Sequence, residues 1–239
     1  MASARLALVT GTSSGIGAAV ARELLRRGWQ VVGVARRTPD LAHGSYRHLA
    51  LDLSDVPAAS TALERDFGAR LAERAWERVG LVNNAAAAPA ERIESLQALE
   101  LLSAFALNAV MPLWLMGFVV RRSDAQIRIV NVSSGAAQRP SPGLAAYCSS
   151  KAALRMAGMA AAAELDARVS VLSYEPGVVD TEMQLAARSK PLAEFPWGET
   201  FRRYHAEGRL VAPELPAADI VEFLESAAAE RFKERRYGT

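Results

Sequence analysis

The chain has 239 residues, 51% of them hydrophobic and 23% charged, with a formal net charge of +2. This composition is typical of a packed globular domain and excludes a disordered, collagen-like or disulfide-rich protein, and the single cysteine, Cys148, favours a reducing compartment such as the cytoplasm. Basic and acidic residues are interspersed, so we expect no nucleic-acid partner.

Short apolar runs alternate with longer helical patterns along the chain. The predicted strands cover residues 5–10, 30–35, 46–52, 80–83, 126–133 and 168–174. The predicted helices cover residues 15–27, 56–78, 93–122, 144–166 and 216–230. The strand runs are apolar throughout rather than alternating, which is typical of strands covered on both faces. The alternation predicts an α/β fold: a single doubly wound parallel sheet of the Rossmann type with helices on both faces.

Two stretches depart from this alternation. Residues 101–120 carry no charge and are long enough to cross a membrane, but their polar residues and proline favour a helix buried in the core. From Thr181 to about residue 212 the pattern weakens, and proline, aromatic residues and arginine become frequent. No internal repeat or long linker interrupts the chain, so we expect one domain over residues 1–239 and no membrane span.

Three glycines follow the first predicted strand, in the sequence Thr10-Gly-Thr-Ser-Ser-Gly-Ile-Gly17. Glycine allows a sharp turn and close approach of a ligand, because it has no Cβ atom. The helix that begins here offers free backbone N–H groups and the positive end of its dipole to a pyrophosphate. A tight strand-to-helix turn would also account for the glycines, but their position after the first strand favours a dinucleotide site.

Two arginines, Arg36 and Arg37, directly follow the second predicted strand. An NAD site usually has an acidic residue near this point for the ribose 2′-hydroxyl, whereas a guanidinium fork suits a 2′-phosphate. The sequence therefore predicts NADP(H) as the cofactor. The alternative is that these arginines are a solvated strand end in an arginine-rich chain.

Tyr147 and Lys151 are four residues apart in a predicted helix, so their side chains lie on one face. An isolated tyrosine is a poor acid or base at neutral pH, but a neighbouring ammonium stabilises the phenolate and lowers the tyrosine pKa. Only three of the 28 basic residues are lysine, so a lysine at this spacing is informative. Taken alone, the pair could still be a coincidence.

Taken together, these motifs resemble the short-chain dehydrogenase/reductase family over the chain through Gln184. The motifs occur in the family's order: Thr10-Gly-x3-Gly15-x-Gly17, Asp52-Leu53, Asn83-Asn84-Ala85, Asn108, Ser133-Ser134, Tyr147-x3-Lys151 and Pro176-Gly177-x3-Thr181. Within the family the chain is most similar to the sepiapterin reductase-like branch, which includes bacterial benzil reductases. This likeness rests on residues 147–151, 174–184 and 208–211.

The resemblance implies four catalytic residues. Tyr147 would donate the proton in reduction, and Lys151 would bind the nicotinamide ribose and lower the Tyr147 pKa. Ser134, thirteen residues before the tyrosine, would polarise the substrate carbonyl, and Asn108 would hold a water of a proton relay.

The resemblance and the arginine argument together give the predicted cofactor-binding set. Asp52 would contact the adenine amino group, Asn83 would line the cleft, and Val179 and Thr181 would hold the carboxamide. The full set is Gly11, Ser13, Ser14, Gly15, Ile16, Gly17, Arg36, Arg37, Asp52, Leu53, Asn83, Ala85, Tyr147, Lys151, Pro176, Gly177, Val179 and Thr181.

Three positions depart from the family pattern. Ala86 replaces the glycine of Asn-Asn-Ala-Gly and adds a methyl group near the cofactor. Glu175 precedes Pro176-Gly177, where a small or apolar residue is usual, and its carboxylate would face either the nicotinamide pocket or solvent. No aspartate follows Asp219, so the C-terminal aspartate that anchors the pterin in sepiapterin reductases is missing and a pterin substrate is not expected.

The sequence thus predicts an NADPH-dependent carbonyl reductase acting on a ketone or vicinal dicarbonyl, a small-molecule substrate. An NAD-dependent alcohol dehydrogenase of the same family and a non-catalytic NADP(H)-sensing protein are the alternatives. The resemblance also implies a substrate lid around residues 181–212. It further implies a homodimer or homotetramer formed through helices around 93–122 and 152–163, with packing inside one subunit as the alternative. The histidines lack metal-ligand spacing, so no metal site is predicted.

Overall fold

A seven-stranded sheet with every strand pair parallel forms the centre of the computed structural model, which describes residues 4–227 and 230–238. The strand order is β3-β2-β1-β4-β5-β6-β7. The strands are β1 (Arg5–Thr10), β2 (Gln30–Ala35), β3 (Tyr46–Ala50), β4 (Arg78–Asn83), β5 (Gln126–Val132), β6 (Val169–Glu175) and β7 (Phe232–Arg236). The order reverses between β1 and β4, and the crevice at such a reversal is where open parallel sheets bind ligands.

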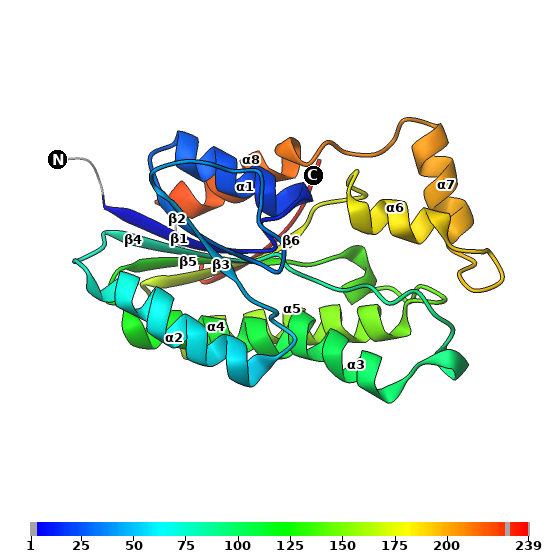
Figure 1. Cartoon of the computed structure of the whole chain (residues 1–239), viewed down its shortest axis with the longest axis horizontal. Helices are drawn as coiled ribbons and strands as arrows, with labels where there is room; N and C mark the ends of the chain where they lie inside the picture. The colour runs from blue at the N-terminus through cyan, green and yellow to red at the C-terminus, as the bar shows by residue number, and fades with distance from the viewer. Residues whose placement is uncertain (1–3, 228–229, 239) are drawn as a thin grey trace.

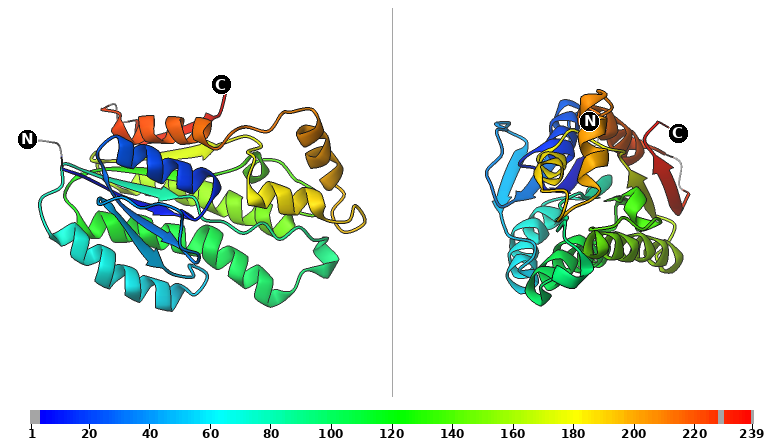
Figure 2. Two further views of the ribbon diagram at one scale, coloured as in Figure 1. Left: turned by 45° about the horizontal axis from the view of Figure 1, so that its top comes forward. Right: turned by 90° about the vertical axis from the view of Figure 1, so that its right-hand side faces the viewer.

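Helices cover both faces of the sheet, as predicted (Figure 1). One face carries α1 (Gly15–Arg26) and α8 (Glu214–Glu225), and the other carries α2 (Val56–Ala72), α4 (Met111–Arg122) and α5 (Ala145–Glu164). Two short helices, α6 (Glu182–Ser189) and α7 (Gly198–Ala206), lie beyond the carboxyl ends of the strands, as Figure 2 shows from a second direction. The predicted doubly wound α/β fold is confirmed.

The apolar strands explain this two-sided architecture. Leu6, Leu8 and Ile129 face the α2–α4–α5 layer within one buried cluster, whereas Ala7 and Val9 face the α1–α8 layer within another. Successive side chains of a strand point to opposite faces, so each strand contributes to both cores. The sheet is therefore shielded from water on both sides, and only its ends are open to a ligand.

The long predicted helix over 93–122 is interrupted. A 3₁₀ turn (η1, Ile93–Ser95) comes first, and α3 (Ala98–Phe105) passes through a π-helical turn (η2, Ala106–Val110) into α4. Pro112 lies in the first turn of α4 and has no N–H, so the carbonyl of Asn108 loses its α-helical donor.

The uncharged stretch 101–120 was expected to be a buried helix, and the helical stretch Ala98–Arg122 that contains it is buried on one side only. It is long and apolar enough to cross a membrane, and half of its most apolar window is buried inside the protein. Leu102 and Leu113 on its outer side are 66% and 53% exposed.

Other predicted boundaries were wrong by a few residues. The helix predicted over 56–78 ends at Ala72, because the Trp76 indole turns into the core and donates to the carbonyls of Arg70 and Leu71 in the last turn. The helix predicted over 216–230 runs instead from Glu214 to Glu225, and residues 228 and 229 lie outside the described residues. Strand β7 was not predicted, because it is short and highly charged. Helices α6 and α7 were not predicted either, because they lie in the stretch after Thr181 where the pattern weakens.

Candidate active site

A cleft of about 1150 Å³ runs across the carboxyl ends of the strands. It is bordered by the turn after β1, the ends of β2, β4, β5 and β6, the start of α5, and helices α6 and α7. The predicted site residues that line it are Gly11, Ser13, Ser14, Gly15, Ile16, Arg36, Arg37, Asp52, Leu53, Ala85, Ser134, Tyr147, Lys151, Pro176, Gly177, Val179 and Thr181. Gly17, Asn83 and Asn108 lie outside this lining.

The glycine turn has the backbone geometry that only glycine adopts readily. Gly11 and Gly15 have φ of +77° and +56°. Gly17 instead allows helix α1 to pack closely, because an added Cβ would lie 2.3 Å from the carbonyl oxygen of Gly11. A ligand can therefore approach the turn at Gly11 and Gly15, while Gly17 lets the start of α1 pack against the Gly11 carbonyl.

A buried hydroxyl pair supports the turn from the third strand. The Thr12 Oγ1 atom lies 3.0 Å from the hydroxyl oxygen of Tyr46, whose side chain passes over Gly33 of β2. A Cβ at Gly33 would lie 2.2 Å from that hydroxyl oxygen. Three residues remote in sequence therefore hold the loop in place. Sequence reasoning missed this contact, since nothing in the pattern links position 46 to position 12.

Ser134, Tyr147 and Lys151 meet at the floor of the cleft. Tyr147 and Lys151 lie one turn apart on α5, and Ser134 follows β5 and hydrogen-bonds with Tyr147. The Lys151 ammonium is buried and donates to the carbonyl of Val132 at 2.7 Å. The ammonium nitrogen lies 5.6 Å from the centroid of the Tyr147 ring.

Burial shifts both titrating groups toward their neutral forms. It raises the pKa of Tyr147 to about 12, although the Ser134 hydrogen bond opposes the rise. It lowers the pKa of Lys151 to about 8. The direction at Tyr147 is opposite to the lowering expected from Lys151, because desolvation dominates here. Tyr147 is therefore protonated at neutral pH, the form that can donate a proton.

Asn108 is buried beneath the cleft, and its side chain is fully engaged. Its amide nitrogen donates to the carbonyl of Ala87 at 2.7 Å and to the Ser150 hydroxyl at 2.9 Å. Its amide oxygen accepts from the Ala87 N–H at 2.8 Å. The side chain therefore joins the loop after β4 to helix α5. Both amide hydrogens of Asn108 are thus taken, its oxygen keeps one lone pair, and the role of Asn108 in holding a water stays a prediction.

Asn83 was expected to line the cleft, and this expectation was wrong. Its side chain is buried and donates to Asn131 on β5 at 2.8 Å. The residue after it, Asn84, lines the cleft and donates to the Thr10 carbonyl at 2.9 Å. Side chains alternate along an extended chain, so the first asparagine faces the core and the second faces the cleft.

Arg36, Arg37 and Asp52 form the charged end of the cleft. The Arg36 guanidinium is 76% exposed and lies 3.9 Å from the Asp52 carboxylate. Arg37 forms an ion pair with Glu182 at the start of α6, which links the two rims. Hydrogen bonds from Ser54 hold the pKa of Asp52 below its usual range. No other acid among the described lining residues lies beside Arg36 and Arg37.

These residues fit a dinucleotide. Two positive-φ glycines face the cleft from the turn after β1, and the exposed guanidiniums of Arg36 and Arg37 lie beside it. An added Cβ at Gly15 would lie 3.0 Å from the Thr181 methyl group across the cleft, so a side chain there would narrow it. The donor set thus suits a phosphate-bearing ligand at this end.

Some lining residues were not singled out from the sequence. They come from the loop after β4, the loop after β5 and the lid region: Ala87, Ala88, Arg139, Glu182 and Lys190. Lys190 donates to the carbonyl of Ala90 at 2.8 Å and so ties the end of α6 to the loop after β4. The run Ala85–Ala88 could have signalled a wide, apolar wall, but alanine is too common in this chain to stand out.

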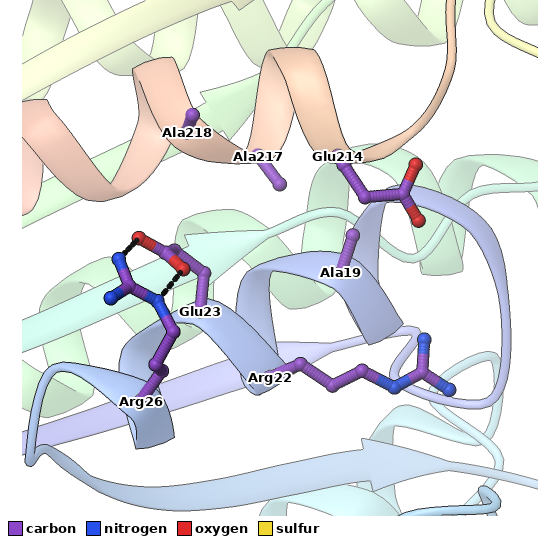
Figure 3. A pocket seen from close by; sticks show the side chains of 7 residues that line it. All are labelled: Ala19, Arg22, Glu23, Arg26, Glu214, Ala217 and Ala218. Atoms are coloured by element: carbon purple, nitrogen blue, oxygen red, sulfur yellow. Dashed lines mark hydrogen bonds and ion pairs between the residues drawn. The ribbon is translucent and has the colours of Figure 1, made fainter.

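A second, shallow hollow of about 260 Å³ lies between α1 and α8 (Figure 3). Ala19, Ala217 and Ala218 form its walls, and Arg26 pairs with Glu23 inside it at 2.7 Å. It contains none of the predicted site residues. Among the described residues no group of three His, Cys, Asp or Glu side chains could hold a metal ion.

Sequence comparison places the chain in a family. The short chain dehydrogenase family matches residues 5–192, and the protein belongs to this family of nicotinamide-dependent oxidoreductases.

Individual relatives are similar over nearly the whole chain. A benzil reductase ((S)-benzoin forming) of Bacillus subtilis is 32% identical over 92% of this chain and 93% of its own length. An NADPH-dependent 3-dehydrocapnine reductase of Ornithobacterium rhinotracheale is 31% identical over 82% of this chain and 74% of its own. The crystal structure of the KRED1-Pglu enzyme superposes with a TM-score of 0.80 at 27% identity, covering 96% of this chain and all of that one.

The buried ammonium of Lys151 gives a test of this geometry. A lysine whose pKa is lowered from 10.5 to about 8 binds fewer protons folded than unfolded between those values, so stability rises with pH there. We expect the unfolding free energy of the wild type minus that of Lys151→Met to rise by about 2 kcal/mol from pH 7.5 to 10. Urea unfolding at both pH values measures it.

Lys233→Met is the matched control for this measurement, because Lys233 is exposed on β7. Its difference from the wild type should stay flat over the same range. A flat difference for Lys151→Met as well would show that the ammonium is solvated.

Proposed function

We propose that this protein is a carbonyl reductase that uses NADPH to reduce ketones, vicinal dicarbonyls in particular. The observation that carries the proposal is the convergence of Ser134, Tyr147 and Lys151 in a cleft whose other end carries the glycine turn. The benzil reductases among the relatives support a dicarbonyl substrate.

When bound, NADPH supplies the hydride. Ser134 donates a hydrogen bond to the substrate carbonyl oxygen, and Tyr147, protonated at neutral pH, donates its proton to the same oxygen. Lys151 keeps a positive charge beside the phenol at neutral pH and stabilises the phenolate left behind. Asn108 holds the loop after β4 against α5 and so keeps the catalytic helix in place.

The segment 181–212 is proposed to cover the substrate. Phe195 is fully buried and packs with Ala90 and Leu144, which anchors the segment to the loops after β4 and before α5. Trp197, Phe201 and Tyr204 then line the outer wall of the cleft. Together with the alanine run they form an apolar wall suited to an aryl or alkyl ketone.

Removing the proton donor tests the reaction. We expect Tyr147→Phe to lower kcat for benzil and for butane-2,3-dione by about 10²- to 10⁴-fold, because a general acid contributes that much. NADPH oxidation followed by absorbance measures it, with NADPH affinity as the check on folding. Tyr237→Phe, at the end of β7 and outside the cleft, should keep the wild-type rate. An unchanged kcat in Tyr147→Phe would overturn the assigned role.

NADPH is favoured over NADH by the two arginines. Arg36 makes only a long, exposed ion pair of 3.9 Å with Asp52, which a 2′-phosphate can replace, whereas Arg37 would have to leave a close ion pair with Glu182. We expect Arg36→Asp to raise the KM for NADPH at least about tenfold and to shift the preference toward NADH. Full kinetics with both cofactors measure this.

Arg22→Asp makes the same charge change on the exposed side of α1, in the hollow of Figure 3. It should leave the cofactor preference as it is. If Arg36→Asp and Arg22→Asp leave the KM for NADPH equally unchanged, Arg36 does not bind the 2′-phosphate, and the argument against the NAD-dependent alternative fails.

We also propose that two copies pair through the exposed side of α3 and α4 together with α5, in a reducing, cytoplasmic environment. Leu99 is 81% exposed, Leu102 66%, and Met156 on α5 58%. Such a run of apolar side chains on packed neighbouring helices is typical of an interface. Light scattering should show a dimer or tetramer that Leu102→Glu dissociates. Leu215→Glu on the opposite layer should leave the mass unchanged, and a monomeric wild type would contradict the proposal.

A further inference from the structure

Two residues of opposite charge, Glu175 and Arg139, line the cleft and have no role in the proposed proton transfer or cofactor binding. Glu175 ends β6 and is partly buried, and Arg139 follows the 3₁₀ turn η3 (Gly135–Ala137); both line the cleft. Within the described residues neither side chain makes a hydrogen bond or an ion pair. Arg155 interacts electrostatically with Glu175, but two hydrogen bonds of 2.6 and 2.8 Å hold its guanidinium on Glu234.

The two groups flank a gap left by a glycine. A Cβ atom on Gly135 would lie 3.2 Å from the Arg139 Nη2 atom and 3.6 Å from the Glu175 Oε2 atom. The space above Gly135 thus has a hydrogen-bond donor on one side and an acceptor on the other.

This gap adjoins the catalytic serine. Gly135 directly follows Ser134 in the chain, and consecutive Cα atoms are about 3.8 Å apart. If Ser134 holds the carbonyl group of a substrate, a substituent of that same substrate bound over Gly135 would therefore be attached only a few bonds away from the carbonyl carbon.

The pair of charges restricts what that substituent can be. A carboxylate would accept from Arg139 but would be repelled by the Glu175 carboxylate. A second carbonyl, as in a vicinal dicarbonyl, would accept from Arg139 and leave Glu175 without a donor. An ammonium would suit Glu175 and be repelled by Arg139. An alkyl group would leave a partly buried carboxylate without a partner. A hydroxyl donates to Glu175 and accepts from Arg139, so it satisfies both.

We propose that Glu175 and Arg139 form a hydroxyl-binding subsite, so that the preferred substrates are ketones with a hydroxyl group on the carbon next to the reducible carbonyl. This inference rests on the proposed reductase function and, among the ketones of that proposal, ranks hydroxyketones above vicinal dicarbonyls. Glu175 and Arg139 act as specificity residues through the substituent, while Ser134 and Tyr147 act on the carbonyl.

The test compares two ketones that differ by one hydroxyl, 1-hydroxybutan-2-one and butan-2-one. We expect the wild type to favour the hydroxyketone at least about tenfold in kcat/KM, as charge-assisted hydrogen bonds to a substrate hydroxyl allow. Glu175→Leu should bring the ratio to about 1–2, and Glu175→Gln, which keeps shape and hydrogen bonding, should give an intermediate ratio. Arg139→Met should lower the ratio as well, by less, because Arg139 is exposed.

Glu64→Gln is the matched control, because it removes an exposed carboxylate on α2, outside the cleft and away from Arg155. Its ratio should equal that of the wild type. A wild type that reduces butane-2,3-dione without preferring the hydroxyketone, or a ratio unmoved by Glu175→Leu, would overturn the subsite.

A binding measurement separates this failure from failure of the reductase function. Trp197 lines the cleft, so its fluorescence can report butane-1,2-diol and butan-2-ol in the presence of NADP without turnover. Tighter binding of the diol, lost in Glu175→Leu, would support the subsite even if no ketone were reduced. Equal binding of the two alcohols would contradict it.

Discussion

The side chain of Thr10 joins the two central strands at the point where the strand order reverses. Its hydroxyl donates to the carbonyl of Val82 at 3.2 Å and accepts from the N–H groups of Asn84 and Ala85 at 2.9 and 3.0 Å. Three hydrogen bonds to one buried oxygen fix the end of β4 against the start of the glycine turn. One residue therefore fixes the ends of β1 and β4 relative to each other, and both ends border the cleft.

The chemistry depends on how little water reaches the floor of this cleft. Desolvation raises the pKa of Tyr147, so the phenol keeps its proton firmly, and lowers the pKa of Lys151, so the ammonium keeps its charge less firmly than an exposed lysine does. Asn108 is hydrogen-bonded to Ala87 and Ser150, and the Asn83 amide nitrogen to Asn131, while the Asn83 amide oxygen is buried without a partner. Within the described part of the chain, the side chains of Glu175 and Arg139 make no hydrogen bond, and the proposed subsite uses them at the substrate end.

The sequence alone was sufficient for the central sheet and for most of the cleft. Apolar strand runs and glycine turns act locally, so β1, β2 and the Tyr147–Lys151 pair were predictable from spacing. Strand β7 was not, because Phe232–Arg236 has a charged sequence and pairs with β6 through its backbone. The direction of the Asn83 side chain and the Thr12–Tyr46 contact depend on strand register and tertiary packing, which no local pattern encodes.

The Tyr46 side chain passes over Gly33, so the residue at position 33 decides where the tyrosine can lie. A Cβ atom at position 33 would lie 2.2 Å from the Tyr46 hydroxyl oxygen, so a larger residue there would push the tyrosine aside. The tyrosine would then be drawn away from Thr12, and the glycine turn would lose its support from β3. A change on β2, a strand without a catalytic residue, would thus reach the cofactor end of the cleft through its neighbour.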